Sequence, residues 1–210
     1  STEPIDTTKY SSIDEAAAKL LALHWKEGLN LKGLKEISPR VATILAQSQG
    51  VSLRLKSLTT IDESVAAALA AYKGELYLDG LTELSDAAAS AFSDFRGTCF
   101  SVWQISKLSQ EAASSLAAIP GELKMSGWPM STLSPETASA LARANRNVWL
   151  KNLTALDDQA ASALSALHGN LEMDKLESLS EGACAALSKQ KGALSLNGVK
   201  ALSDAGAAAL

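Results

Sequence analysis

The sequence has few of the residues that usually carry out chemistry. Its 210 residues include only two histidines and two cysteines, and the phosphate-binding motifs GxGxxG and GxxxxGKS/T are absent. His24 occupies a helix-end packing position and His168 a polar one, and no nucleophile or carboxylate can be placed beside either. Neither metal-ligand spacing nor paired catalytic carboxylates stand out. We therefore expect no enzymatic activity, no cofactor and no metal ion.

Long apolar stretches and a strong charge of one sign are also absent. No apolar run approaches the roughly 18 residues that a membrane-spanning helix needs, and the start STEPIDTTKY lacks the basic and apolar regions of a signal peptide. The net charge of −4, with both signs interspersed, gives no electrostatic reason for binding nucleic acid or an anionic membrane. A composition of 47% hydrophobic and 20% charged residues is typical of a soluble globular protein with a continuous core.

A repeat runs through the whole sequence. The final stretch GALSLNGVKALSDAGAAAL closely matches GELYLDGLTELSDAAASAF at residues 74–92, and pairs of apolar residues around one polar residue recur every 23 to 25 residues. We number the first residue of each pair as position 0. Position 0 is occupied by Ile5, Leu29, Leu53, Leu76, Phe100, Leu123, Val148, Leu171 and Leu194. The sequence thus predicts one domain over residues 1–210 with about nine repeats, of which the first and last are atypical or incomplete.

Each repeat changes its periodicity midway. The opening, such as residues 76–79, alternates apolar and polar residues, which predicts a short half-buried strand. The second half, such as residues 86–94, has apolar residues at helical spacing. Position +9 is always Ser or Asp, which can accept hydrogen bonds from the first turn of a helix, and Pro follows it twice. Glycines near the repeat ends, such as Gly74 and Gly97, are expected to end the helices in the left-handed conformation.

Apolar columns connect the repeats. Position +16 is apolar in every copy, from Leu21 to Leu210, once a two-residue insertion in the sixth copy is allowed, and position +13 is Ala except for Cys184. A short strand and a short helix cannot bury an apolar face alone, so each repeat should complete the core of its neighbour. We expect strands to pack beside parallel strands and helices beside helices. Because helices are wider than the spacing between strands, the stack should curve with the sheet inside.

This pattern resembles the leucine-rich repeat family over essentially its full length, most closely a bacterial class with alanine-rich repeats of about 23 residues. The resemblance implies an α/β fold: a curved leucine-rich-repeat solenoid with a parallel β-sheet on the concave face and short α-helices on the convex face. It also implies an interaction scaffold, without naming a ligand. The chain departs from the family at position +5, where many members carry Asn and this chain carries residues such as Leu34 and Trp128. A solenoid of helical hairpins is the alternative fold, disfavoured because the LxLxG segments are short and glycine-rich.

Side chains at positions +1 and +3 should point out of the concave face, because alternation directs them away from the core. Cations and aromatic residues occupy these positions in the middle repeats, whereas Glu172 and Asp174 occupy them later. Large exposed apolar groups tend to mark interaction sites. The candidate ligand-binding residues are Arg54, Lys56, Tyr77, Trp103, Lys124, Ser126, Trp149 and Lys151. The competing explanation is that a rim loop, a neighbouring chain or another domain covers the tryptophans.

The sixth repeat carries two extra residues between Trp128 and Leu133, in the stretch GWPMSTLS. Trp128 falls at the buried position +5, and Pro129 and Met130 are expected to bulge at the rim. Irregular insertions on one side of a repeat protein often serve binding. The competing explanation, which we favour slightly, is that the insertion accommodates the bulky Trp128 in the core.

We expect a non-catalytic binding module whose ligand is a protein or peptide. Cations around Trp103 and Trp149 would favour an acidic or carboxylate-bearing partner. A carbohydrate is the alternative ligand, with Trp103, Trp149 and Tyr77 stacking on sugar rings. A purely structural array within a longer chain is the third hypothesis, because the ending LSDAGAAAL stops inside a helical pattern without a polar cap. The unpaired strand edge at residues 194–196 also predicts end-to-end self-association.

Overall fold

Short strands alternate with short helices along the chain. The computed structural model describes residues 7–24, 26–125, 127–144 and 146–210. After a 3₁₀ turn at Thr7–Lys9, the helices are α1 (Glu15–His24), α2 (Pro39–Ala46), α3 (Glu63–Ala70), α4 (Asp86–Phe92), α5 (Gln110–Ala117), α6 (Pro135–Arg143), α7 (Asp158–Leu164), α8 (Glu181–Leu187) and α9 (Asp204–Ala209). The strands are β1 (Leu29–Asn30), β2 (Ser52–Arg54), β3 (Glu75–Tyr77), β4 (Cys99–Ser101), β5 (Glu122–Lys124), β6 (Val148–Trp149), β7 (Leu171–Glu172) and β8 (Leu194–Ser195). The predicted α/β class is confirmed.

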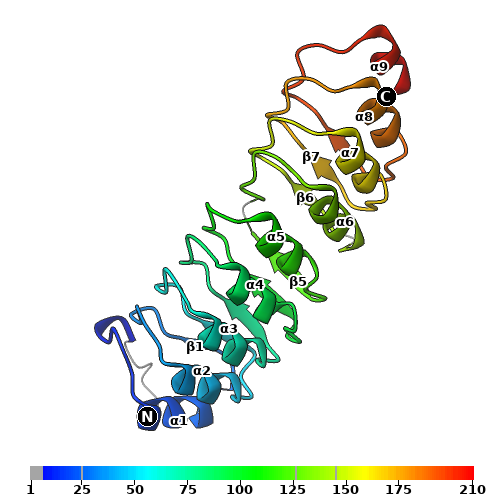
Figure 1. The fold of residues 1–210 in the computed structure, drawn as a ribbon. Coiled ribbons are helices and arrows are strands. Elements are labelled where there is room, and N and C mark those ends of the chain that lie inside the picture. Colours follow the sequence, from blue (N-terminus) through cyan, green and yellow to red (C-terminus); the bar gives the residue numbers. More distant parts are fainter. Residues whose placement is uncertain (1–6, 25, 126, 145) are drawn as a thin grey trace. The chain divides into compact units, whose positions relative to one another are not determined.

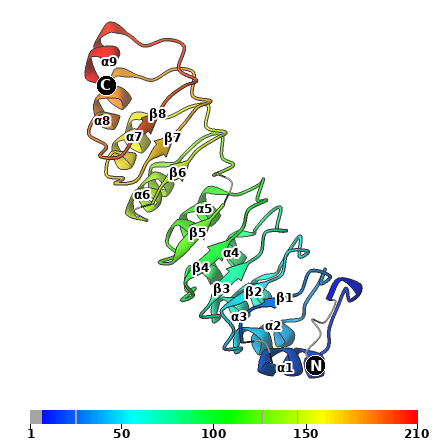
Figure 2. The same cartoon turned by 180° about the vertical axis from the view of Figure 1, so that it is seen from behind.

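The chain forms two compact units. The N-terminal unit consists of Ser1–Ser106 and Ile119–Met125, and the C-terminal unit consists of Lys107–Ala118 and Ser126–Leu210. Each unit holds one sheet of parallel strands, in the order β1-β2-β3-β4-β5 in the N-terminal unit and β6-β7-β8 in the C-terminal unit. Figure 1 and, from behind, Figure 2 show helices along one side of each sheet. The parallel pairing is confirmed within each unit, whereas a single domain and its curvature stay predictions.

The residue at position +9 starts the helix in every repeat. Its side-chain oxygen accepts a hydrogen bond from the backbone N–H three residues later, as Ser38 Oγ does from Val41 at 3.2 Å and Asp157 Oδ1 does from Ala160 at 2.7 Å. Such a bond satisfies one of the N–H groups that a helix leaves free and stabilises the helix by roughly 1 kcal/mol. The predicted helix starts are therefore confirmed.

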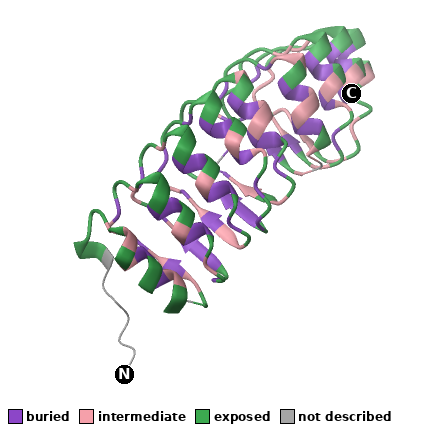
Figure 3. Ribbon diagram, turned by 60° about the horizontal axis from the view of Figure 1, so that its bottom comes forward, coloured by how far each residue is buried: buried purple, intermediate pink, exposed green. Residues whose placement is uncertain are grey.

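The core lies between the helices and the sheet of each unit, and Figure 3 shows the buried parts of the helices as the turns nearest the strands. Position +13 is fully buried in the first eight repeats, from Ala18 to Cys184, as the repeat alignment predicts. In the first and last repeats, predicted core positions are wrong, and Ala207 at position +13 of the ninth repeat is exposed. Tyr10 at position +5 is 55% exposed and Leu210 at position +16 is 46% exposed. Both lie in outermost repeats, where described residues of only one neighbouring repeat contribute to the packing.

The glycines near the repeat ends have a different role from the predicted one. The helices end in right-handed residues such as Gln47, and within the described residues the positive-φ glycines are Gly28 and Gly127. A Cβ at Gly97 would lie 2.3 Å from the carbonyl oxygen of Gly74. The predicted left-handed caps are therefore wrong at these positions, and glycine is needed because consecutive repeats approach too closely for a side chain.

In the C-terminal unit, the side chains of two asparagines just before the strands form hydrogen bonds to the next repeat. The sequence patterns do not predict these bonds. Asn147 Oδ1 accepts a hydrogen bond from Asn170 N–H at 3.0 Å, and Asn170 Oδ1 accepts one from Ala193 N–H at 3.1 Å. In the N-terminal unit the equivalent bond joins backbone groups, from Glu75 N–H to the Val51 carbonyl at 2.8 Å. Because a side chain replaces the backbone acceptor, β7 has two residues where β3 has three.

Candidate functional site

The candidate residues of the N-terminal unit lie on the sheet face opposite the helices. In β2 and β3, Leu53 and Leu76 at position 0 are fully buried against the helices, whereas Arg54 and Tyr77 at position +1 are half-buried. The strand register aligns Arg54 with Tyr77, Tyr77 with Ser101 and Ser101 with Lys124. The structure thus brings three predicted site residues, Arg54, Tyr77 and Lys124, into one row across four strands.

Tyr77 lies within this row between two cations. The guanidinium carbon of Arg54, from β2, is 4.6 Å from the Tyr77 ring centroid, and Lys124 Nζ, from β5, is 5.9 Å from it. Cations are attracted to the face of an aromatic ring. The Tyr77 hydroxyl donates to Glu75 Oε2 at 2.9 Å, and burial together with this carboxylate raises the pKa of Tyr77. The phenol is therefore held in place and stays protonated at neutral pH.

Carboxylates neutralise two of the predicted cations. Lys56 Nζ lies 3.4 Å from Asp79 Oδ2, and Lys124 Nζ lies 3.3 Å from Glu122 Oε2. The predicted outward positions are +1 and +3, but position −1 lies on the same face of each strand and carries Glu75 and Glu122. The same alternation rule could have found them. The N-terminal face is therefore less cationic than its lysines and arginine indicate.

Both candidate tryptophans are exposed. Trp103, in the turn after β4, has 54% of its surface exposed, and Trp149, in β6, has 37% exposed. Trp103 belongs to the N-terminal unit and Trp149 to the C-terminal unit, so a single ligand-binding face that holds both stays a prediction. Ser126 lies outside the described residues. In the inserted stretch, Trp128 is 2% exposed as predicted, but Met130 is 5% exposed and does not project at the rim.

The sheet face of the C-terminal unit is acidic next to its tryptophan. Trp149 pairs in register with Glu172 of the neighbouring strand. Two residues beyond Glu172, Asp174 Oδ1 accepts hydrogen bonds from Ser195 Oγ at 2.7 Å and from Asn197 N–H at 3.2 Å. These bonds, that from Ser195 above all, lower the pKa of Asp174. Both carboxylates lie on the face that alternation directs away from the helices.

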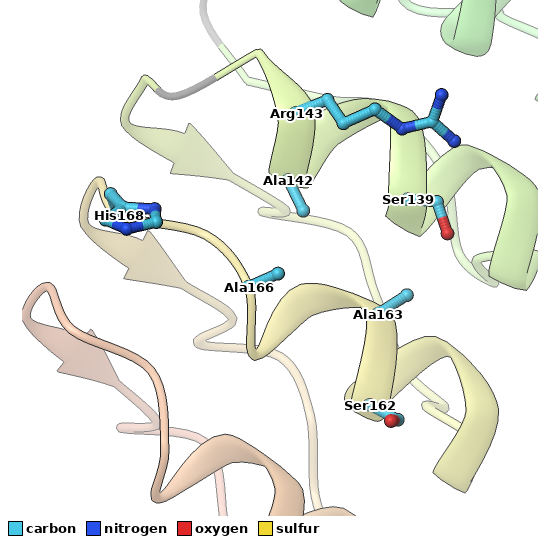
Figure 4. A pocket seen from close by; sticks show the side chains of 7 residues that line it. All are labelled: Ser139, Ala142, Arg143, Ser162, Ala163, Ala166 and His168. Atoms are coloured by element: carbon cyan, nitrogen blue, oxygen red, sulfur yellow. The ribbon is translucent and has the colours of Figure 1, made fainter.

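The remaining nucleophile candidates are packed in the core or isolated. Cys99 and Cys184 are free, each is at most 1% exposed, and burial raises the pKa of both thiols, so neither is a ready thiolate. A groove of about 540 Å³ between α6 and α7 is lined by Ser139, Ala142, Arg143, Ser162, Ala163, Ala166 and His168. Figure 4 shows that Arg143 and His168 do not point toward one another. The neighbour of His168 is Lys191, with 3.4 Å between the two nitrogens. This groove therefore has no converging set of polar groups.

Three further findings bear on function. Within residues 7–24, 26–125, 127–144 and 146–210, no helix has both the length and the apolar character needed to cross a membrane. The same residues contain no cluster of three or more His, Cys, Asp or Glu side chains that could hold a metal ion. No protein-family model matches the sequence, and no curated protein matches it at a significant level. The side chains of the two sheet faces are thus the basis for inferring function.

Proposed function

We propose that this chain is a non-catalytic binding module of the leucine-rich repeat type, a solenoid that contacts a protein or peptide through its sheet faces. The regularity of the repeats supports the solenoid: consecutive strands pair in sequence order within each unit, and every repeat starts its helix with the same hydrogen bond. Stacked repeats present a continuous row of outward side chains from consecutive strands, which suits extended partners.

The exposure of Trp103 on a rigid support is the observation that carries the proposal. The strand before it is buried along its length, since Cys99, Phe100 and Ser101 are each at most 3% exposed, yet Trp103 itself is 54% exposed. A tryptophan on a rigid element supplies a large contact area at low entropic cost. Truncating such an anchor commonly weakens binding by about 2 kcal/mol or more.

Arg54 is the best candidate among the nearby cations for binding a carboxylate of the partner. Lys56 and Lys124 already have carboxylates within 4 Å. Arg54 makes no ion pair within 4.0 Å with the residues that the structure describes, and Tyr77 supports its guanidinium from one side. An acidic group bound there would speed association at low salt.

A peptide is favoured over a carbohydrate by the surroundings of Tyr77. Sugar recognition needs an open aromatic face, but Arg54 and Lys124 already lie over the Tyr77 ring. A sugar ring would have to displace a cation before it could stack on Tyr77. Trp103 by itself provides a single aromatic ring for stacking. The purely structural array ranks third, because a spacer has no need of exposed tryptophans such as Trp103 and Trp149.

A displayed random-peptide library, selected against the full chain, tests the proposal. We expect enriched peptides that bind the wild type and lose at least tenfold in affinity to the Trp103→Ala and Trp149→Ala double variant. Leu23→Ala is the matched control, because Leu23 is an apolar side chain 72% exposed on α1, away from the sheet. A glycan array is probed in parallel. Glycan binding without tryptophan-dependent peptides would replace the proposal by the carbohydrate hypothesis.

A further inference from the structure

A lysine, an aspartate and a serine from three consecutive repeats form a connected group on the N-terminal sheet face. Ser101 Oγ donates to Asp79 Oδ1 at 2.5 Å, which orients the carboxylate. Lys56 Nζ lies 3.4 Å from the other oxygen, Oδ2. Asp79 therefore uses one oxygen for a structural hydrogen bond and presents the second oxygen to a cation.

The same residue types recur at equivalent positions on the C-terminal sheet face, as Lys151, Asp174 and Ser195. The structural hydrogen bond is kept, since Ser195 Oγ donates to Asp174 Oδ1 at 2.7 Å. The ion pair is not kept. Among the residues that the structure describes, no lysine or arginine nitrogen lies within 4.0 Å of Asp174.

Lys151, which could cover Asp174 as Lys56 covers Asp79, instead contacts Gly127. Gly127 precedes the inserted residues and has φ +138°, a conformation that favours glycine. A Cβ at Gly127 would lie 3.1 Å from both Cγ and Cδ of Lys151, so the aliphatic stem of Lys151 packs against Gly127. The stem is thereby directed to the repeat before its own, whereas Asp174 lies in the repeat after it.

We propose that Trp149, Glu172 and Asp174 bind a lysine or arginine side chain of the partner, in the way that Asp79 binds Lys56 within the chain. The inference rests on the proposed function and specifies the chemistry of its partner. Trp149 and Glu172 are in register on neighbouring strands, so an aromatic face and two carboxylates lie on one surface. Aromatic faces and carboxylates both attract cations, and Asp174 is ionised at neutral pH because hydrogen bonds lower its pKa.

Titration of the full chain with two short peptides, monitored by the Trp149 indole signal in ¹H–¹⁵N NMR spectra, tests this inference. The peptides are acetyl-GKGKG-amide and acetyl-GEGEG-amide. We expect a saturable shift with the lysine peptide and none with the glutamate peptide. The lysine-peptide affinity should fall as salt is raised, because exposed ion pairs are screened.

Substitution of the two carboxylates provides the decisive variant. Glu172→Gln with Asp174→Asn should weaken the lysine peptide about tenfold, because two exposed charge pairs are lost. The asparagine oxygen still accepts the hydrogen bonds of Ser195 and Asn197, so the fold is kept. Glu177→Gln is the matched control, because Glu177 pairs with Lys200 at 2.7 Å and should not contribute to the site.

The possible outcomes separate this inference from the proposed function. Equal binding of both peptides, preference for the glutamate peptide, or unchanged binding by the carboxylate variant would overturn the cation site. Lysine-peptide binding, followed here by the backbone amide signals of β7, that is lost in Trp149→Ala but kept in the carboxylate variant would also overturn it, while still supporting a peptide-binding face. A library selection without tryptophan-dependent peptides would instead contradict the proposed function.

Discussion

In the N-terminal unit Asp79 binds Lys56 and Ser101, whereas in the C-terminal unit the equivalent Asp174 binds Ser195 and Asn197 and, among the described residues, no lysine. Position +1 of the same repeats shows a similar contrast. Tyr77 in the N-terminal unit carries Arg54 over its ring, but Glu172 in the same column faces Trp149 instead. Two sheets built from the same repeat thus present different surfaces, one with its charges largely paired and one with open carboxylates.

This difference indicates that the residue types at the exposed positions of the repeat can vary independently of those at the buried positions. Position 0 is apolar in both units and buried in inner repeats of each, as Leu76 and Leu171 show, although Leu123 and Leu194 are half-buried. Positions +1 and +3 contribute little to the core, so their chemistry can change from one repeat to the next without changing the fold. Binding specificity can therefore differ between the two units of one chain.

The largest expected effect tests whether the two units share one kind of core. Leu69 in α3 and Leu164 in α7 occupy position +16 and are both fully buried. We expect Leu69→Ala and Leu164→Ala each to lower the free energy of unfolding by roughly 2 to 5 kcal/mol, because the packed stack cannot collapse onto the cavity. Leu210→Ala, in the same column but 46% exposed, should cost less than about 0.5 kcal/mol. Denaturant unfolding measures the free energy of unfolding of all three variants. A large loss for only one of Leu69→Ala and Leu164→Ala would show that the two units do not share one kind of core.

Alkaline titration distinguishes the units through Tyr72. Its hydroxyl donates to the Gly50 carbonyl at 2.6 Å and its side chain is fully buried, whereas the same column of the C-terminal unit holds Leu167. Burial raises the pKa of Tyr72 to about 12. The unfolded chain ionises near pH 10 and the folded chain only near pH 12, so this contribution to stability is complete below pH 10 and is lost between about pH 10 and 12.

Tyr72→Phe should therefore be less stable than the wild type at pH 7 by roughly 1 kcal/mol, through the lost hydrogen bond. The stability of the wild type relative to this variant should then decline by roughly 2 kcal/mol between pH 10 and 12. Unfolding of both proteins at each pH is the measurement. If the difference in unfolding free energy between the two proteins did not change with pH, Tyr72 would have the same pKa in the folded and unfolded chains, contrary to the prediction.

A smaller effect is expected for the asparagine ladder of the C-terminal unit. Asn147→Ala removes the acceptor of the Asn170 N–H and should cost about 0.5 to 1.5 kcal/mol. Asn147→Asp keeps an oxygen acceptor and should restore most of the loss. Thr98→Ala in the N-terminal unit is the control, because its ladder bond comes from the backbone carbonyl. We expect the Asn170 amide to exchange its hydrogen faster in Asn147→Ala than in the other two variants, because only that variant lacks the acceptor. Equal exchange in all three variants would contradict a stabilising role of this hydrogen bond.

Most of the repeat could be predicted because its signals are local. Ser or Asp at position +9 needs only the next helical turn to act as a cap, and the apolar columns follow from periodicity. The role of Gly97 could not be predicted, since the close contact is with Gly74 of another repeat. The ladder of Asn147 and Asn170 could not be predicted from the family pattern, because these asparagines precede the strands whereas the family's asparagine follows the strand.

The candidate site was only partly predictable. Alternation correctly indicated that Trp103 and Trp149 are exposed. It could not show that Lys56 and Lys124 pair with carboxylates, because that depends on rotamers and on neighbours from other strands. The contact of Lys151 with Gly127 accompanies a positive-φ backbone conformation at Gly127, which the periodic pattern does not encode.

The central claim is that Trp103 and Trp149 serve binding and not folding, and one double variant tests it directly. Trp103→Ala with Trp149→Ala should change the free energy of unfolding by less than about 1 kcal/mol, because both side chains are exposed. The same protein should lose the peptides that the wild type selects, in direct binding measurements at matched concentration. A double variant that unfolds, or that binds those peptides as the wild type does, would contradict the claim.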